Sequence, residues 1–318
     1  MKNSYSNIFS FNKQILKKSI INLSNGDVIG LPTETVYGLG GNAYSKKSIQ
    51  KIYKLKGRPK SNPLIVHYFN LEDASQDVII NDRFKKLYKR FCPGPITFIL
   101  TKKNGSKINS LASAKLNTIA IRFPKHRAIR SILKKIDFPL AMPSANKSNN
   151  VSPVTAEDVF DEFNKEIKLI IDGGKCKIGI ESTVVDLVSV PKILRPGIIE
   201  KSSIEKILKK KIKKNIRNKK IISPGMMKKH YSPGIPVLIN QKKHDGISAF
   251  IYLGNNHKNK KKFFSLSKKL DLTEAASNLY RLFRLIKKKG YKKIQIGKIP
   301  NLGSGIAIND RIQRASKS

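Results

Sequence analysis

Two hydrophobic patterns alternate along the chain up to about residue 200. Apolar positions at helical spacing predict helices over residues 12–24, 46–55, 82–91, 126–135 and 155–163. Short aliphatic runs predict strands over residues 28–31, 64–68, 96–101, 118–122, 139–143, 169–172 and 182–187. Helices that alternate with strands in this way are typical of an α/β fold.

The pattern changes after residue 201. Lysine clusters between residues 209 and 220 interrupt a weak helical pattern, which favours a linker with a solvated charged helix over an RNA-binding run. Further on, strands are predicted over residues 237–239, 249–254 and 294–296, and a helix over residues 273–289. We therefore expect a first domain over residues 1–205, a linker over 206–235 and a small α/β domain with a parallel sheet over 236–318.

The chain is strongly basic. Its 318 residues include 64 Lys and Arg against 21 Asp and Glu, which gives a net charge of +43. Such an excess favours polyanionic partners such as RNA or nucleotides. A coding bias toward Lys, Asn and Ile would give much of the same charge without a cognate partner. Hydrophobic residues make up 39% of the chain, enough for a folded core.

Targeting and metal signals are weak. Cys92 and Cys176 lack CxxC spacing and a nearby histidine, so we expect neither a disulfide scaffold nor a metal site. The first twenty residues do not read as a secretory signal. No apolar run approaches the roughly eighteen residues of a membrane span. The expectation is a cytoplasmic protein with no membrane segment.

The common catalytic motifs are missing from the sequence. It contains no GxxxxGK[ST], GxSxG or HExxH pattern. Residues 38–43 fit GxGxxA, but they do not directly follow the apolar run at 28–31. No acidic residue occurs from Tyr44 to Leu71 to hold a ribose, so a dinucleotide site is disfavoured.

Small polar groups gather in five turns, at residues 32–35, 56–62, 144–146, 179–183 and 195–197. Each adjoins a predicted strand, and in an open α/β sheet such turns converge on one edge. Lys56 and Arg58 supply two cations, while Ser144 and Asn146 supply a hydroxyl and an amide at the same spacing. This combination suits a polyphosphate.

Two plainer interpretations stand beside that one. The 56–62 turn, taken alone, could be a solvated loop in a lysine-rich protein. His67 lies on a predicted strand, where a lone histidine is more often structural than catalytic. Its place next to the basic turn makes a role in the site equally acceptable.

A family resemblance rests on motifs spread through the chain. They are PTETVYGLG at 32–40, KGRPxxNPL at 56–64, PGPxT at 93–97, AxRxP at 120–124, PSAN at 143–146, IDGG and GxEST within 171–183, and LRPG at 194–197. In order and spacing these resemble the YrdC-like domain of threonylcarbamoyl-AMP synthases. The segment 223–233 and the tail through residues 303–311 resemble the longer, two-domain branch of that family.

The resemblance implies a fold and a reaction. The fold would be a twisted open mixed sheet with helices and a basic cleft, followed by a smaller Rossmann-like α/β domain. L-threonine, bicarbonate and ATP would give L-threonylcarbamoyladenylate and pyrophosphate. Magnesium would be held mainly by phosphates and water, with no protein ligands. A partner transferase would pass the threonylcarbamoyl group to tRNA, and weak tRNA binding is a further implication.

The resemblance also implies roles for individual residues. The phosphate-binding and catalytic set would be Lys56, Arg58, Ser144 and Asn146. The nucleotide would contact Arg58, Asn62, Thr118, Ser144, Ser152, Arg195 and Tyr231. Threonine would contact Thr35, His67, Arg122 and Ser182, and the backbone of Met142. Arg122 would clamp the threonine carboxylate with two parallel hydrogen bonds.

The sequence departs from the family pattern in three places. Met227 stands for a usual basic residue, Lys228 for a usual aromatic one, and Glu34 for a frequent Asp. The first two leave the contacts of the linker open. Two alternatives to the synthase remain: a non-enzymatic RNA-binding protein using the same basic cleft, and a carbamoyl-transfer enzyme with another substrate. The latter kind carries additional zinc-finger and acylphosphatase parts that do not appear in this sequence.

Overall fold

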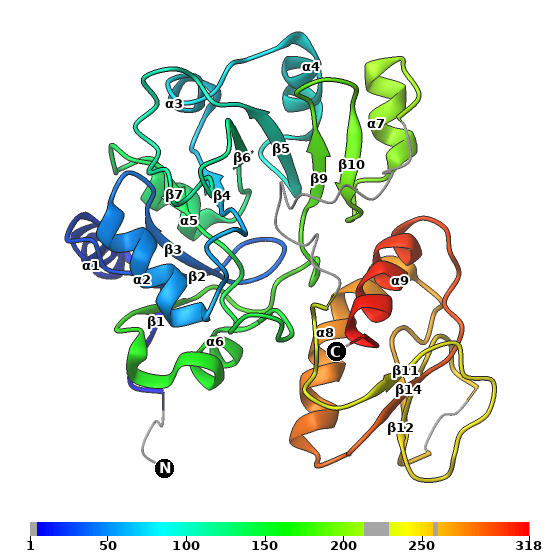
Figure 1. The fold of residues 1–318 in the computed structure, drawn as a ribbon. Coiled ribbons are helices and arrows are strands. Elements are labelled where there is room, and N and C mark those ends of the chain that lie inside the picture. The colour runs from blue at the N-terminus through cyan, green and yellow to red at the C-terminus, as the bar shows by residue number, and fades with distance from the viewer. Residues whose placement is uncertain (1–4, 213–228, 257–259, 318) are drawn as a thin grey trace.

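The computed structural model describes residues 5–212, 229–256 and 260–317, which form two sheets with flanking helices (Figure 1). The larger sheet has ten strands in the order β1-β8-β2-β3-β7-β4-β6-β5-β9-β10. These are β1 (Ile8–Ser10), β2 (Ile29–Leu31), β3 (Gly38–Asn42), β4 (Ile65–His67), β5 (Ile96–Thr101), β6 (Thr118–Arg122), β7 (Leu140–Ala141), β8 (Ile170–Asp172), β9 (Thr183–Asp186) and β10 (Lys192–Arg195). The sheet is mixed: β5 runs antiparallel to β6 and parallel to β9.

Most helices of this domain begin at a polar residue whose side chain caps the first turn. They are α1 (Lys13–Ser24), α2 (Lys46–Lys56), α3 (Leu71–Ser75), α4 (Asp82–Phe91), α5 (Arg127–Leu133), α6 (Ala156–Phe163) and α7 (Lys201–Leu208), with a 3₁₀ turn η1 (Asn164–Glu166). Thr155 caps α6 in a capping box with Asp158, as their spacing predicts. The C-terminal end of α2 lies at Gly57, whose φ of 57° is in the left-handed region. That reversal carries the chain directly into the basic 56–62 turn.

The second domain holds a four-stranded parallel sheet in the order β11-β14-β12-β13. Its strands are β11 (Val237–Leu238), β12 (Ala249–Tyr252), β13 (Phe263–Ser265) and β14 (Ile294–Ile296), and its helices are α8 (Leu272–Lys288) and α9 (Ser304–Ala315). The expectation of a small parallel α/β unit is confirmed. Figure 1 shows α8, in orange, on the side of this domain that faces the first one.

Several elements were not predicted from the sequence: β1, β3, α3, β10, β13 and α9. Most of these strands are edge strands or short, and β3 is glycine-rich, so they lack the aliphatic run used to recognise strands. The expected boundary between residues 205 and 206 falls inside α7, which buries Ile204 and packs beside α4. Residues 213–228, which carry most of the predicted linker, lie outside the described residues.

The core of the molecule is aliphatic and aromatic, and it runs under both sheets. Among the helices that the structure describes, none combines the length and apolar character needed to cross a membrane.

Candidate active site

The five polar turns meet at one pocket. It is lined by Thr33, Val36, Tyr37, Gly38, Arg58, Ile65, His67, Arg122, Met142, Pro143, Ser144, Glu181, Arg195 and His230. Each turn contributes at least one of these residues, although the first and the last turn are about 160 residues apart in sequence. Six predicted site residues are part of the lining: Arg58, His67, Arg122, Met142, Ser144 and Arg195.

Lys56 and Arg58 are buried beside the 144–146 turn. Lys56 Nζ donates to the carbonyl oxygen of Ser144 at 2.5 Å and also to that of Asn146. The Arg58 guanidinium donates to the Asn62 carbonyl at 3.0 Å and to its Oδ1 at 2.6 Å. Lys56 therefore ties α2 to the turn, and Asn62 orients Arg58 toward the pocket.

Burial of these two cations makes the region favourable for an anion. Burial, together with the Arg58 charge, lowers the pKa of Lys56 well below its ordinary value. Burial likewise lowers the pKa of Arg58 to about 10. A negatively charged ligand would offset the cost of keeping both groups charged away from water.

Arg122 and His67 lie side by side at the ends of paired strands β6 and β4. Arg122 Nη2 donates to Glu34 Oε1 at 2.7 Å, and the Lys125 amide donates to Glu34 Oε2 at 3.0 Å. Burial alone would raise the pKa of Glu34, but the Arg122 charge and the Lys125 amide outweigh it and lower the pKa. Glu34 is therefore an ionised partner that holds Arg122 in place.

Two buried nitrogen atoms at this point lack a partner. Within the described ranges, neither Arg122 Nε nor His67 Nε2 has a hydrogen-bond partner. Burial, with the Arg122 charge, lowers the pKa of His67 well below its usual value, so the imidazole is neutral. Buried polar atoms are nearly always paired, and an unpaired one is costly. A polar ligand in the pocket would therefore gain by pairing with both.

Ser182 is held between two strands. Its Oγ lies 2.7 Å from Thr97 Oγ1 and accepts from Arg195 Nη2 at 3.1 Å. Arg195 Nε also donates to the Ser182 carbonyl at 3.0 Å. Thr35 is buried and lies one hydrogen bond from the lining, since its Oγ1 is 2.8 Å from that of Thr33. These hydroxyls form the neutral part of the site.

The rear wall of the pocket is shared with the second domain. Glu181 accepts from Ser152 Oγ at 2.6 Å, from Arg311 Nε at 2.9 Å and from Tyr280 Oη at 3.0 Å. Burial opposes its charge, but Arg311 and Arg195 dominate and lower the pKa of Glu181 to about 2. The Tyr231 ring stacks on Tyr280, with centroids 5.7 Å apart. The linker residues next to the pocket are thus fixed by α8 and α9.

The remaining predicted residues lie at differing distances from the pocket. Met142 packs its side chain against Gly38, and its amide donates to the Ile65 carbonyl at 2.8 Å. Asn146 is buried, and within the described residues its Oδ1 has no partner. Thr118 is half-buried at the start of β6, four residues from Arg122, a separation of about 13 Å along a strand. It is not part of the pocket lining.

Sequence reasoning did not assign Glu181, His230, Tyr280 or Arg311 to the site. Glu181 lies inside the GxEST motif and Arg311 at the end of the tail motif. Both motifs were recognised in the sequence, but neither residue was given a role. In the part of the chain that the structure describes, no group of three or more His, Cys, Asp or Glu side chains is placed to hold a metal ion.

Comparison with known families decides where the chain belongs. One family model, covering the Sua5, YciO and YrdC proteins and described as telomere recombination, matches residues 22–197. A second, described as the C-terminal domain of threonylcarbamoyl-AMP synthase, matches residues 199–317. The chain belongs to the threonylcarbamoyl-AMP synthase family. The two matches together reproduce its two-domain form.

Relatives of known name agree with this assignment. Threonylcarbamoyl-AMP synthase of Pyrococcus abyssi is 32% identical, with 92% of each chain covered. That of Bacillus subtilis is 34% identical, covering 92% of this chain and 90% of the relative. A P. abyssi structure solved in complex with L-threonine superposes with a TM-score of 0.89 at 30% identity, covering 98% of this chain and 96% of its own. The expected fold, with a large mixed sheet and a second small domain, is therefore that of this family.

Proposed function

We propose that this chain is an L-threonylcarbamoyladenylate synthase, which makes threonylcarbamoyl-AMP and pyrophosphate from L-threonine, bicarbonate and ATP. The observation that carries the proposal is the meeting of Arg58, His67, Arg122, Ser144 and Arg195 in one pocket. Relatives that match both domains carry this activity in their names. The relative solved with L-threonine supports threonine as the amino-acid substrate.

The reaction needs alignment more than covalent help from the protein. Bicarbonate first loses hydroxide to give carbon dioxide. The threonine amine then attacks this carbon and gives up a proton, so that a carbamate forms while the proton and the hydroxide leave as water. A carbamate oxygen then attacks the α-phosphorus of ATP, and pyrophosphate leaves. Such transfers depend on positioning and on stabilising charge at the phosphates. This accounts for a site without a nucleophile motif.

Cationic and neutral groups divide the work between them. In this proposal Arg122, with its unpaired Nε, binds the threonine carboxylate, and neutral His67, Thr35 and Ser182 line the amino-acid end. Arg58, Ser144 and Asn146 face the phosphates, and Lys56 supports the turn through its hydrogen bonds to the Ser144 and Asn146 carbonyls. Asn62, Thr118, Ser152, Arg195 and Tyr231 remain our candidates for contacts to the nucleoside.

Mg²⁺ would be held mainly by the phosphates and water, and it would offset the negative charge of the triphosphate. A threonylcarbamoyl transferase acting on tRNA in the cytoplasm would consume the product. The charge of +43 is compatible with weak tRNA binding beside that transfer.

A direct assay separates this proposal from the RNA-binding alternative. The full chain is incubated with ATP, Mg²⁺, labelled bicarbonate and one amino acid at a time, and pyrophosphate and the labelled adenylate are measured. We expect threonine to be used, serine somewhat less and valine far less. A missing methyl group costs about 1–3 kcal/mol, whereas a missing hydroxyl leaves buried polar groups unpaired. RNA binding without any adenylate would favour the alternative, and equal use of valine and threonine would show that the hydroxyl is not recognised.

A further inference from the structure

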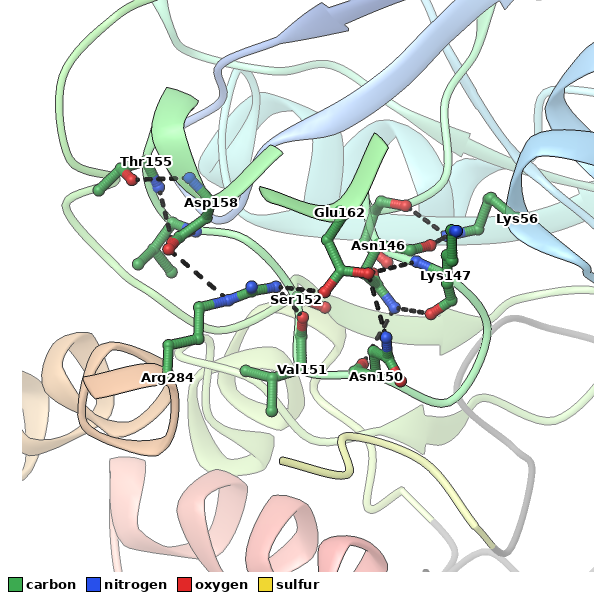
Figure 2. A network of polar contacts seen from close by, with 12 residues as sticks. Lys56, Asn146, Lys147, Asn150, Val151, Ser152, Thr155, Asp158, Glu162 and Arg284 are labelled. Atoms are coloured by element: carbon green, nitrogen blue, oxygen red, sulfur yellow. Dashed lines mark hydrogen bonds and ion pairs between the residues drawn. The ribbon is translucent and has the colours of Figure 1, made fainter. Parts of the chain in front are cut away.

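One arginine of the second domain contacts the segment that follows the 144–146 turn, which we call the phosphate turn (Figure 2). Arg284 lies on α8, and its Nη2 donates to the Val151 carbonyl at 2.5 Å and to Glu162 Oε1 at 3.1 Å. Its Nε lies 3.7 Å from Asp158 Oδ1. The side chains of Arg284 and Glu162 are 19% and 10% exposed, so solvent screens this ion pair less than a surface pair.

Glu162, on α6, continues the connection into the turn. Its Oε2 accepts from the Lys147 amide at 3.0 Å and from Asn150 Nδ2 at 3.1 Å. One carboxylate therefore joins α8 to both ends of the 147–150 loop. Figure 2 shows Glu162 between Arg284 on one side and the loop on the other.

The loop in turn fixes the phosphate turn itself. Asn146 Nδ2 donates to the Lys147 carbonyl at 2.7 Å and to the Asn150 carbonyl at 3.0 Å. The Asn146 carbonyl accepts from Lys56 Nζ. A continuous chain of hydrogen bonds thus leads from α8 through Glu162 and the loop to Asn146 and Lys56.

The same loop also binds the linker through backbone hydrogen bonds. The Ser232 amide donates to the Asn149 carbonyl at 2.7 Å, and the Val151 amide donates to the Ser232 carbonyl at 3.1 Å. Ser232 directly follows Tyr231, whose ring packs on Tyr280 of α8. The phosphate turn, the linker and the second domain therefore share residues 147–151 as a common support.

We infer that Arg284 and Glu162 are positioning residues for ATP: they transmit the docking of the second domain to the phosphate turn. The inference rests on the proposed function. Neither side chain lines the pocket, so they act by holding Asn146 and Lys56 in place. Small displacements of a positioned group are enough to cost activity. On this view the second domain contributes to nucleotide binding without touching the nucleotide.

The test compares ATP with threonine in the full chain. We expect Arg284→Ala to raise the KM for ATP, and the Kd for a non-hydrolysable ATP analogue, about tenfold, the effect of losing one charge-assisted hydrogen bond. The KM for threonine should stay within about twofold, since Arg122 and His67 lie outside the network. Glu162→Ala should raise the KM for ATP at least as much as Arg284→Ala, because it also removes the acceptor of the Lys147 amide and Asn150. The double variant should raise it by less than the product of the two single effects, because both single variants break the same ion pair.

Glu162→Gln separates the two halves of the connection. The glutamine oxygen can still accept from the Lys147 amide and Asn150, while the ion pair with Arg284 is lost. We expect a KM for ATP between those of the wild type and Glu162→Ala. Lys175→Ala is the matched control, because Lys175 bonds Asn278 of the same helix at 3.0 Å without touching the loop. It should leave the KM for ATP unchanged.

The outcomes distinguish the inference from the proposed function. If the wild type makes no adenylate, the proposed function fails first. If the wild type is active and Arg284→Ala behaves like Lys175→Ala, or raises both KM values equally, the positioning role is wrong. Should Arg284→Ala fail to fold, Arg284→Gln keeps much of the side-chain length but loses the charge that pairs with Glu162. It should still weaken analogue binding selectively, and an unchanged Kd would overturn the inference.

Discussion

At the scale of single residues, the structure changes how Lys56 is understood. Sequence reasoning predicted that its charge faces the triphosphate, whereas its ammonium is bonded to two carbonyls of the phosphate turn. Arg58 does line the pocket. The two cations therefore make different contacts although they are two residues apart, and spacing alone could not separate them.

Lys56→Ala and Arg58→Ala should both abolish most synthase activity in a folded protein. For Arg58, loss of a charge-assisted contact in the transition state costs about 2–4 kcal/mol, a rate effect of roughly thirty- to a thousandfold. Lys56→Ala would act by releasing the turn that carries Ser144 and Asn146. Lys56→Ala should in addition lower the melting temperature, because the turn loses its anchor on α2. Pyrophosphate release and thermal melting measure the two effects. Near-normal release by folded Lys56→Ala would show that activity does not need this anchor, and near-normal release by Arg58→Ala would rule out its phosphate role.

His230 should make the stability of the protein depend on pH. Burial lowers its pKa to about 3, from an ordinary value near 6.5. Between about pH 6.5 and pH 3, His230 therefore binds a proton in the unfolded chain but stays neutral in the folded chain. Stability is full above about pH 6.5 and falls as the pH drops toward 3, by about 1.4 kcal/mol per unit for one histidine.

Replacing this histidine should flatten the pH profile. Between pH 7 and pH 5, His230→Asn should lose about 2 kcal/mol less of its free energy of unfolding than the wild type. Urea unfolding at the two pH values measures this difference. The same loss in both proteins would mean that His230 is not the group responsible.

At the scale of elements, prediction followed hydrophobic content. The helices α1, α2, α4 and α6 and the aliphatic strands β5 and β6 could be read directly from their periodicity. The strand β3 could not, because its GLGGN sequence lacks side chains that favour strands. Only the tertiary structure explains it: a β-carbon on Gly38 would lie 2.5 Å from Met142 Cγ, and one on Gly40 would lie 2.6 Å from Leu31 Cδ1.

Gly38→Ala should therefore damage the site through packing. The new methyl group would force the buried Met142 side chain to move, and overpacking of this kind costs about 1–3 kcal/mol. Because both residues line the pocket, we expect weaker threonine binding together with a lower melting temperature. Gly105→Ala is the comparison variant. An added β-carbon there meets no other atom, but the φ is 81°, so any loss of stability comes from backbone strain alone. Equal threonine affinity in the wild type and Gly38→Ala would contradict this account.

At the scale of the whole molecule, the sequence predicted the location of the site better than its support. The polar turns could be placed on one sheet edge because strand ends in an α/β sheet converge there. The contacts from the second domain could not, since they join residues far apart, such as Glu181 with Arg311, and no periodicity records such pairs. Ion pairs across a domain interface become visible only when both domains are in place.

The linker should act as a lid over the pocket. His230 lines the pocket, while Tyr231 is fully buried with a φ of 65°, a conformation that costs a non-glycine residue about 1–3 kcal/mol. The remaining cavity is only about 40 Å³. Sites for small molecules usually measure several hundred Å³. We expect ATP and threonine to enter when the linker segment around His230 and Tyr231 moves aside, and its return would exclude water from a labile adenylate.

Truncation after Lys220 should thus lower adenylate yield, or raise the amount of ATP consumed per adenylate, without unfolding the first domain. Tyr231→Ala should reproduce part of this loss, because the ring would no longer stack on Tyr280 or lie 5.1 Å from the Arg311 guanidinium. The ratio of pyrophosphate released to adenylate retained measures the effect, and circular dichroism checks the fold. A passive tether would leave that ratio unchanged in both variants. In that case the small cavity would have to open by movement of the pocket wall around Met142 and Ser144.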